Sequence, residues 1–153
     1  ADVARFILDE DPETVTAQMT ASGMGEGVED SAMSVWTMQS GAMVMTHESF
    51  THPFAGSGLE VHGTEGSIFA KDVMTQRPVG EIELATAEGR ESVPYSDHDL
   101  YVQGLADFAA AIRGEGPPAA TGWDGVKSLA VAHAVRKSAQ SGQREAVDYG
   151  GTP

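Results

Sequence analysis

Alternation of apolar and polar residues runs through the middle of this 153-residue chain, whereas helical periodicity is confined to its two ends. A period of two is typical of half-buried strands. It predicts strands over 13–20, 32–39, 42–50, 59–73 (a hairpin), 80–94 and 146–149. Because the strands cluster in the middle of the chain and do not alternate with helices, the sequence predicts an α+β fold: an open, mainly antiparallel β-sheet with helices packed on one face.

The hairpin is the most clearly marked of these elements. Leu59 and Val61 alternate with polar neighbours, and alternation resumes at Ser67 after a segment that begins and ends with glycine, residues 63–66. Glycine adopts positive φ at little cost, so this segment predicts a turn. The pair Ser40-Gly41 likewise predicts a tight turn between the two long strands.

Three helices are expected outside the strands. The first covers residues 2–8, where the apolar side chains have i, i+3, i+4 spacing, and Asp11-Pro12 ends it. The second begins at a capping box, Ser96 to Asp99, and carries one apolar stripe: Tyr101, Leu105, Phe108 and Ile112. The third begins at a second capping box, Thr121 to Asp124, and its shared face is formed by Val126, Leu129, Ala130, His133 and Ala134.

The first helix starts almost at the first residue, with only Ala1 before it. A helix usually has a capping residue and some chain before its first turn. Loss of an initiator methionine is one explanation, and a boundary within a longer chain is the better one. We therefore expect further sequence upstream.

The two long strands carry apolar residues on both faces. In the first, Met33 and Val35 point away from Trp36 and Met38, and in the second Val44 points away from Met43 and Met45. Strands of this kind are covered on both sides. The helices can cover one face, so the other needs a second domain, a second subunit or a ligand. A charge introduced at Trp36 is expected to weaken such an association.

Composition excludes several classes of function. The chain has 23 acidic and 9 basic residues and a formal net charge of −14, which opposes binding to nucleic acid and to anionic membranes. No apolar run approaches the roughly 20 residues that span a bilayer. The absence of cysteine excludes disulfides and thiol catalysis, and is consistent with a cytoplasmic protein.

Few residues suggest chemistry by themselves. The glycine-rich segment 23–27 lies between predicted strands and has acidic neighbours, so it predicts a linker rather than a phosphate-binding loop. His133 is expected to be packed within a helix face. A small metal-dependent enzyme is the least favoured reading, because its ligands would have to be His47, His52 and His62, and nothing in their spacing requires them to converge.

Four segments, taken in order, resemble the C-terminal domain of the Gfo/Idh/MocA family of nicotinamide-dependent oxidoreductases. The segments are DVARFIL (2–8), LEVHGTEGSI (59–68), the helix from Phe108 to Gly114, and GPPAATGWDGVKSL (116–129), which continues to Ser138-Ala139. The resemblance covers nearly the whole chain. It therefore implies one domain over residues 1–153, with a dihydrodipicolinate-reductase-like fold.

The resemblance also implies what is missing. Family members carry an N-terminal Rossmann domain that binds NAD or NADP, and this chain has neither that domain nor a cofactor site of its own. In the family, the sheet of the C-terminal domain forms one wall of the substrate site and commonly forms a subunit interface. The resemblance implies three kinds of partner: further copies of the chain, in a homodimer or tetramer formed through the sheet face; the missing Rossmann domain; and a sugar, polyol or related substrate. It implies no binding to nucleic acid or to a membrane.

Site residues follow from the resemblance only in part. The family's catalytic lysine, in a Glu-Lys-Pro motif, is absent, and its catalytic histidine lies three residues before the position of Asp2. Asp2 is then a remnant of the catalytic helix, Tyr101 resembles a substrate-contacting tyrosine, and the chain alone is expected to be inactive. The alternative is a free-standing binding or assembly module that keeps the fold without the chemistry.

Overall fold

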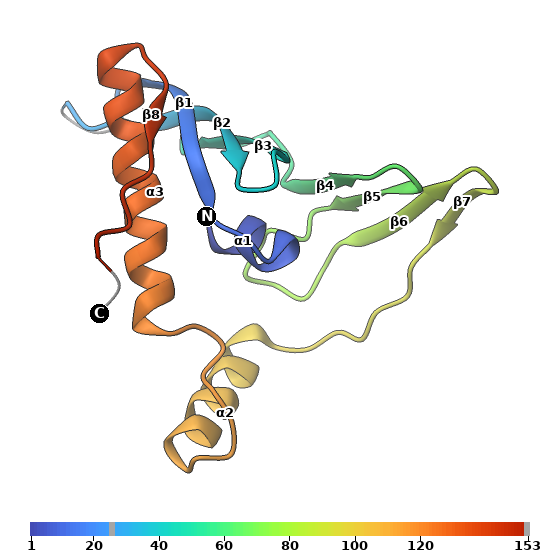
Figure 1. The fold of residues 1–153 in the computed structure, drawn as a ribbon. Coiled ribbons are helices and arrows are strands. Elements are labelled where there is room, and N and C mark those ends of the chain that lie inside the picture. The colour runs from blue at the N-terminus through green and yellow to red at the C-terminus, as the bar shows by residue number, and fades with distance from the viewer. Residues whose placement is uncertain (25–26, 152–153) are drawn as a thin grey trace. The chain divides into compact units, whose positions relative to one another are not determined.

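The computed structural model describes residues 1–24 and 27–151, and the chain divides into two compact units (Figure 1). The first unit comprises Ala1–Pro53 and Ala120–Pro153, and the second comprises Phe54–Ala119. Within these described residues, all strands pair antiparallel in two four-stranded sheets, which confirms the α+β fold with open antiparallel sheets. Residues 25 and 26 of the predicted linker lie outside the described residues.

The first unit contains one sheet and two helices. Its elements are α1 (Asp2–Leu8), β1 (Pro12–Thr20), β2 (Ser31–Met38), β3 (Met43–Ser49), α3 (Gly122–Ser141) and β8 (Glu145–Ala146). The strand order is β3-β2-β1-β8, so the last strand of the chain pairs with the first. β8 is shorter than predicted and begins one residue earlier, at Glu145.

Helix α3 packs against β1 and closes the core of this unit. Val15 and Trp36 from the sheet meet Val131 and Ala134 from α3, and all four are at least 95% buried. The fully buried Ser138 extends this contact, because its Oγ accepts a hydrogen bond from the Ala17 N–H at 3.0 Å and donates one to the Gln143 carbonyl at 2.6 Å.

Two details predicted for this core are wrong. Trp36 lies on the helix side of the sheet, so a charge there would disrupt the core rather than a surface contact. The buried face of α3 is formed by Val131, Ala134 and Ser138, whereas Leu129 and His133 are exposed. Small and β-branched side chains allow α3 to approach β1 closely, which a stripe of larger residues would not.

The second unit contains a simple meander and one helix. Its elements are β4 (Gly58–His62), β5 (Gly66–Lys71), β6 (Glu81–Thr86), β7 (Gly89–Ser92) and α2 (Leu100–Ile112). The predicted hairpin turn is confirmed, and Gly63 N–H donates to the Gly66 carbonyl at 2.9 Å. Gly66 is required here, because a Cβ at this position would lie 2.8 Å from the Ala85 carbonyl oxygen.

Helix α2 begins later than its predicted capping box. Asp99, not Ser96, is the N-cap, and its carboxylate accepts hydrogen bonds from the backbone N–H groups of Tyr101 and Val102. An aspartate at this position satisfies two of the donors that a helix leaves free at its start. Among the described residues, no helix combines the length and apolar character needed to cross a bilayer.

Candidate functional site

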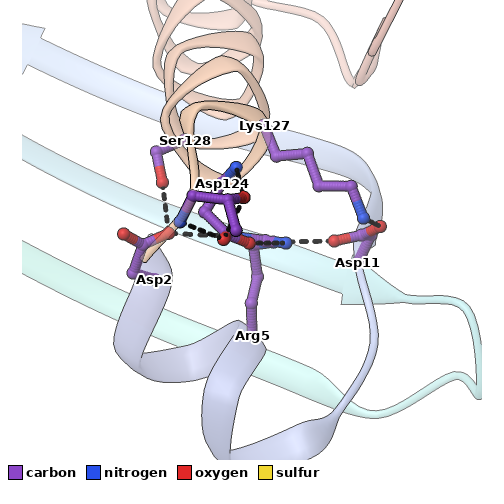
Figure 2. A network of polar contacts seen from close by, with 7 residues as sticks. Asp2, Arg5, Asp11, Asp124, Lys127 and Ser128 are labelled. Carbon is purple, nitrogen blue, oxygen red and sulfur yellow. Dashed lines mark hydrogen bonds and ion pairs between the residues drawn. The ribbon is translucent and has the colours of Figure 1, made fainter. Parts of the chain in front are cut away.

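A network of polar side chains joins α1, the start of β1 and the first turns of α3 (Figure 2). Arg5 is its centre. The guanidinium donates from Nε to Asp11 Oδ1 at 2.7 Å, from Nη1 to Asp2 Oδ1 at 3.0 Å, and from Nη2 to Asp124 Oδ1 at 3.3 Å. One cation thus contacts three carboxylates, drawn from α1, from the residue before β1 and from α3.

Two residues of α3 complete the connections. Lys127 Nζ donates to Asp11 Oδ2 at 2.6 Å, so Asp11 is shared between two cations. Ser128 Oγ donates to Asp2 Oδ1 at 2.6 Å and ties the first turn of α1 to α3. The segments at residues 2–11 and 124–128 are far apart in sequence, and this network holds them together.

The capping box of α3 belongs to the same network. Thr121 donates from Oγ1 and from its backbone N–H to Asp124 Oδ2, at 2.6 and 2.8 Å, and accepts from the Asp124 N–H at 3.2 Å. The box predicted from the sequence is therefore confirmed. Asp124 uses one carboxylate oxygen to start α3 and the other to bind Arg5.

Burial and charge shift the pKa values of these groups. Burial by itself raises the pKa of Asp11, but the hydrogen bonds and charges of Lys127 and Arg5 outweigh it, and the pKa falls below its ordinary value. The hydroxyl and N–H of Thr121, with a further contribution from Arg5, lower the pKa of Asp124 to about 2. Both carboxylates are thus held ionised, which suits an anchor better than a group that exchanges protons.

A second candidate surface is the side of the first sheet opposite α3, here called the outer face. Its residues, from β1, β2 and β3, are Thr14, Thr16, Gln18, Thr20, Ser31, Met33, Val35, Thr37, Met43, Met45, His47 and Ser49. Cross-strand partners such as Val35 and Met45 lie directly opposite each other on it. Met43 and Met45 are 79% and 85% exposed.

The outer face differs from the rest of the chain in charge. None of its twelve residues is Asp, Glu, Lys or Arg, although 21% of the residues in the sequence are charged. Arg144 reaches its margin, where Nε donates to Thr14 Oγ1 at 2.8 Å. The outer face therefore combines exposed apolar side chains, hydroxyl groups and a near absence of charge.

The two residues singled out by resemblance lie in different units. Asp2 belongs to the polar network of the first unit, where Arg5 and Ser128 both donate to its Oδ1. Tyr101 lies in the first turn of α2 in the second unit and is 60% exposed. Asp2 thus ties the start of α1 to α3. The contacts of Tyr101 do not indicate a chemical role for its side chain.

The histidines do not assemble into a metal centre within the part of the chain that is described. The rings of His47 and His52 meet edge to face, 5.4 Å apart. His62 lies in the second unit and is bonded to Ser67 and Glu60 instead. Among residues 1–24 and 27–151, no three His, Asp or Glu side chains are grouped so that they could hold a metal ion.

Sequence patterns did not identify Arg5, Asp11 or Lys127. Each occupies a position where a charged residue is ordinary, and the contacts of Arg5 with Asp124 and of Lys127 with Asp11 span more than 100 residues. Only the i, i+3 spacing of Asp2 and Arg5 gives a local signal. The spacing of residues in the sequence could not predict that α1 contacts α3 in the tertiary fold.

Comparison with known proteins decides which family has this architecture. Residues 1–148 match the family described as the oxidoreductase family, C-terminal alpha/beta domain, GFO_IDH_MocA_C. The chain belongs to the Gfo/Idh/MocA oxidoreductase family. It corresponds to the C-terminal alpha/beta domain, as the four resembling segments predicted.

Two relatives have named activities. The chain is 48% identical over 151 residues to 1,5-anhydro-D-fructose reductase from Ensifer adhaerens, a match that covers 98% of this chain and 45% of that protein. It is 34% identical over 149 residues to inositol 2-dehydrogenase from Rhizobium meliloti (strain 1021), covering 90% and 44% respectively. This Gfo/Idh/MocA domain thus spans less than half the length of these relatives.

Solved structures agree on the fold. An oxidoreductase from Agrobacterium radiobacter, crystallised in complex with NAD+, L-tartaric acid and magnesium, superposes with a TM-score of 0.77 at 22% identity. The match covers 95% of this chain and 46% of that one. At this level of identity the comparison supports the fold alone.

The polar network yields a first prediction. Arg5→Met removes the cation but keeps much of the side-chain volume, and leaves Asp2 and Asp124 without their guanidinium partner. We expect the free energy of unfolding of the first unit to fall by about 2 kcal/mol, as for hydrogen bonds to charged groups in part-buried sites. Urea denaturation monitored by the fluorescence of Trp36 and Trp123, both in the first unit, measures the change.

The exposed pair of Arg113 and Glu115 supplies the matched control. Its side chains are more than half exposed, so Arg113→Met is expected to change the free energy of unfolding much less than Arg5→Met does. Equal losses for the two variants would show that the Arg5 network does not hold the unit together.

Acid should weaken the same network. Because the pKa of Asp124 is about 2 in the folded chain and its ordinary value is 3.8, the ionised carboxylate stabilises the fold above pH 3.8. This contribution is lost as the pH falls from 3.8 towards 2. Asp124→Asn is therefore expected to be less stable than the wild type at pH 6, with a difference that shrinks through that window.

Urea denaturation at several pH values tests this prediction. Asp97→Asn, at an exposed position outside the network, is expected to follow the wild type at every pH. A stability difference between Asp124→Asn and the wild type that stays constant from pH 6 to pH 2 would contradict the assignment.

Proposed function

We propose that this chain is the C-terminal half of an NAD- or NADP-dependent reductase or dehydrogenase that acts on a sugar, a polyol or a related compound. The observation that carries the proposal is the 48% identity with 1,5-anhydro-D-fructose reductase, which extends over 98% of the chain. The match to inositol 2-dehydrogenase supports the same substrate class, because both relatives are named for polyhydroxylated rings.

The nicotinamide cofactor belongs to the other half of such a protein. Dinucleotide sites combine a strand, a glycine-rich turn and a helix whose N-terminus faces the pyrophosphate. The glycine-rich segment 23–27 of this chain is followed by a strand, β2, and its flank is acidic, so it does not fit a phosphate group. When bound, the cofactor supplies or accepts the hydride, and this chain contributes the wall beside it.

The polar network gives this chain a positioning role in the proposed reaction. The family resemblance places a catalytic histidine three residues before the position of Asp2, the first residue of α1. Arg5 and Ser128 bind Asp2, and Arg5 also binds Asp124, so the start of α1 is fixed to α3. We assign Asp2 to this anchoring and retain Tyr101, exposed on α2, as the proposed substrate contact.

A second copy of the chain is the proposed occupant of the outer face. Two copies that each carry a net charge of −14 repel one another over most of their surface. The outer face carries no Asp, Glu, Lys or Arg and exposes Met33, Val35, Met43 and Met45, so it is the surface where association removes apolar area from water with little opposing charge. This supports a homodimer, with a tetramer built on it.

Steady-state assays test the activity. The longer protein that contains this chain is expected to reduce 1,5-anhydro-D-fructose with NADPH or NADH, or to oxidise inositol with NAD+, as measured by absorbance at the nicotinamide band. The chain of 153 residues alone is expected to be inactive, since it lacks both the cofactor site and the proton donor. Turnover by this chain alone, or no activity of the longer protein on any sugar or polyol, would overturn the proposal.

Substitution on the outer face tests the association. Met45→Glu places a carboxylate on the edge strand β3 of this face, and burying it against a second copy would require its desolvation. We expect the dimer measured by sedimentation velocity to dissociate at least about tenfold more readily. Met74→Glu, at a 52% exposed methionine of the second unit, is the matched control and should leave the sedimentation unchanged.

A further inference from the structure

Three of the seven methionines lie on the outer face. Met33, Met43 and Met45 are 55%, 79% and 85% exposed, whereas Met38, on the opposite side of β2, is fully buried. The strand register brings the methionines together, because Met43 and Met45 follow each other on one side of β3 and pair with Thr37 and Val35. Met43 and Met45, the two most exposed methionines among the described residues, therefore lie where association is proposed.

A thioether is the one apolar side chain that a mild oxidant converts into a polar one. The sulfur lone pair attacks an oxygen of a hydroperoxide, the O–O bond breaks, and the second oxygen leaves as water or an alcohol after proton transfer. The sulfur is oxidised by two electrons, the peroxide is reduced by two, and the product is a sulfoxide. Its S=O group is a hydrogen-bond acceptor that is costly to bury without a donor.

We propose that Met43 and Met45 form a peroxide-sensitive control site on the outer face, at which oxidation separates two associated copies of the chain. The proposal rests on the proposed function of this face as a self-association surface. The residues opposite on β2, Val35 and Thr37, offer at most one hydroxyl donor for two sulfoxides. Oxidation would therefore replace apolar contact by unsatisfied acceptors over the area that a second copy covers.

The coupling between methionine oxidation and association of two copies also acts in the reverse direction. If oxidation weakens association, then association must disfavour oxidation of the same sulfurs by the same factor at equilibrium, and it also covers them from solvent. Met24 and Met74 are 68% and 52% exposed but lie outside the outer face. They provide internal references whose oxidation should not depend on association.

The experiment combines peptide mass spectrometry with sedimentation velocity on the whole chain. Hydrogen peroxide is added at protein concentrations below and above the dissociation constant of the dimer. Met43 and Met45 are expected to oxidise faster in the dilute sample, while Met24 and Met74 oxidise at equal rates in both. After oxidation the dissociation constant is expected to rise by about tenfold or more, and methionine sulfoxide reductase should restore it.

Leucine variants separate this effect from general damage. Met43→Leu/Met45→Leu keeps an apolar side chain of similar volume at both positions, so it should associate like the wild type and lose most of its sensitivity to peroxide, with Met33 as the one methionine left on the outer face. Met24→Leu/Met74→Leu should remain sensitive. Far-UV circular dichroism of the oxidised wild type should match the reduced chain, because the buried Met38 is protected.

Two failures can be told apart. A chain that stays monomeric at every concentration, before and after oxidation, would overturn both the proposed association and this inference. A dimer whose dissociation constant is unchanged once Met43 and Met45 are fully oxidised would leave the association standing and overturn the control site alone.

Discussion

The ion pairs of Arg5 are the interaction on which the arrangement of the first unit depends. A seven-residue helix such as α1 is not stable by itself, and none of its residues is buried. It is held by a guanidinium that donates to Asp2, Asp11 and Asp124, and by the shared carboxylate of Asp11, which also accepts from Lys127. Because these partners come from both ends of the chain, the network also joins the first strand to the last long helix.

The sheet of the first unit has two faces with different roles. The inner face is closed by α3 through Val15, Trp36, Val131 and Ala134, and Ser138 satisfies backbone groups from β1 and from the end of α3. The outer face exposes three methionines and carries no Asp, Glu, Lys or Arg. A chain with so large a negative charge can associate with itself most readily where that charge is absent, which is why we connect this face with the proposed dimer.

Sequence alone predicted the element types and their order, because period-two alternation and capping boxes are local signals. The β4–β5 hairpin and the Thr121–Asp124 cap were found in this way, and so was the family. Predictions that required knowing which side of an element faces the core were less successful. Trp36 was expected to test an outer contact and lies inside, and α3 presents Ser138 rather than Leu129 to the sheet. The Arg5 network escaped prediction because its partners are brought together only by the tertiary fold.

A double-mutant cycle on Arg5 and Asp11 measures whether the network holds α1 to the body of the first unit. Arg5→Met, Asp11→Asn and the double variant are compared with the wild type by urea denaturation at pH 7. We expect a coupling energy of about 0.5–3 kcal/mol, as for contacting charged groups in a part-buried network. A coupling energy near zero would mean that α1 is held by contacts other than this network.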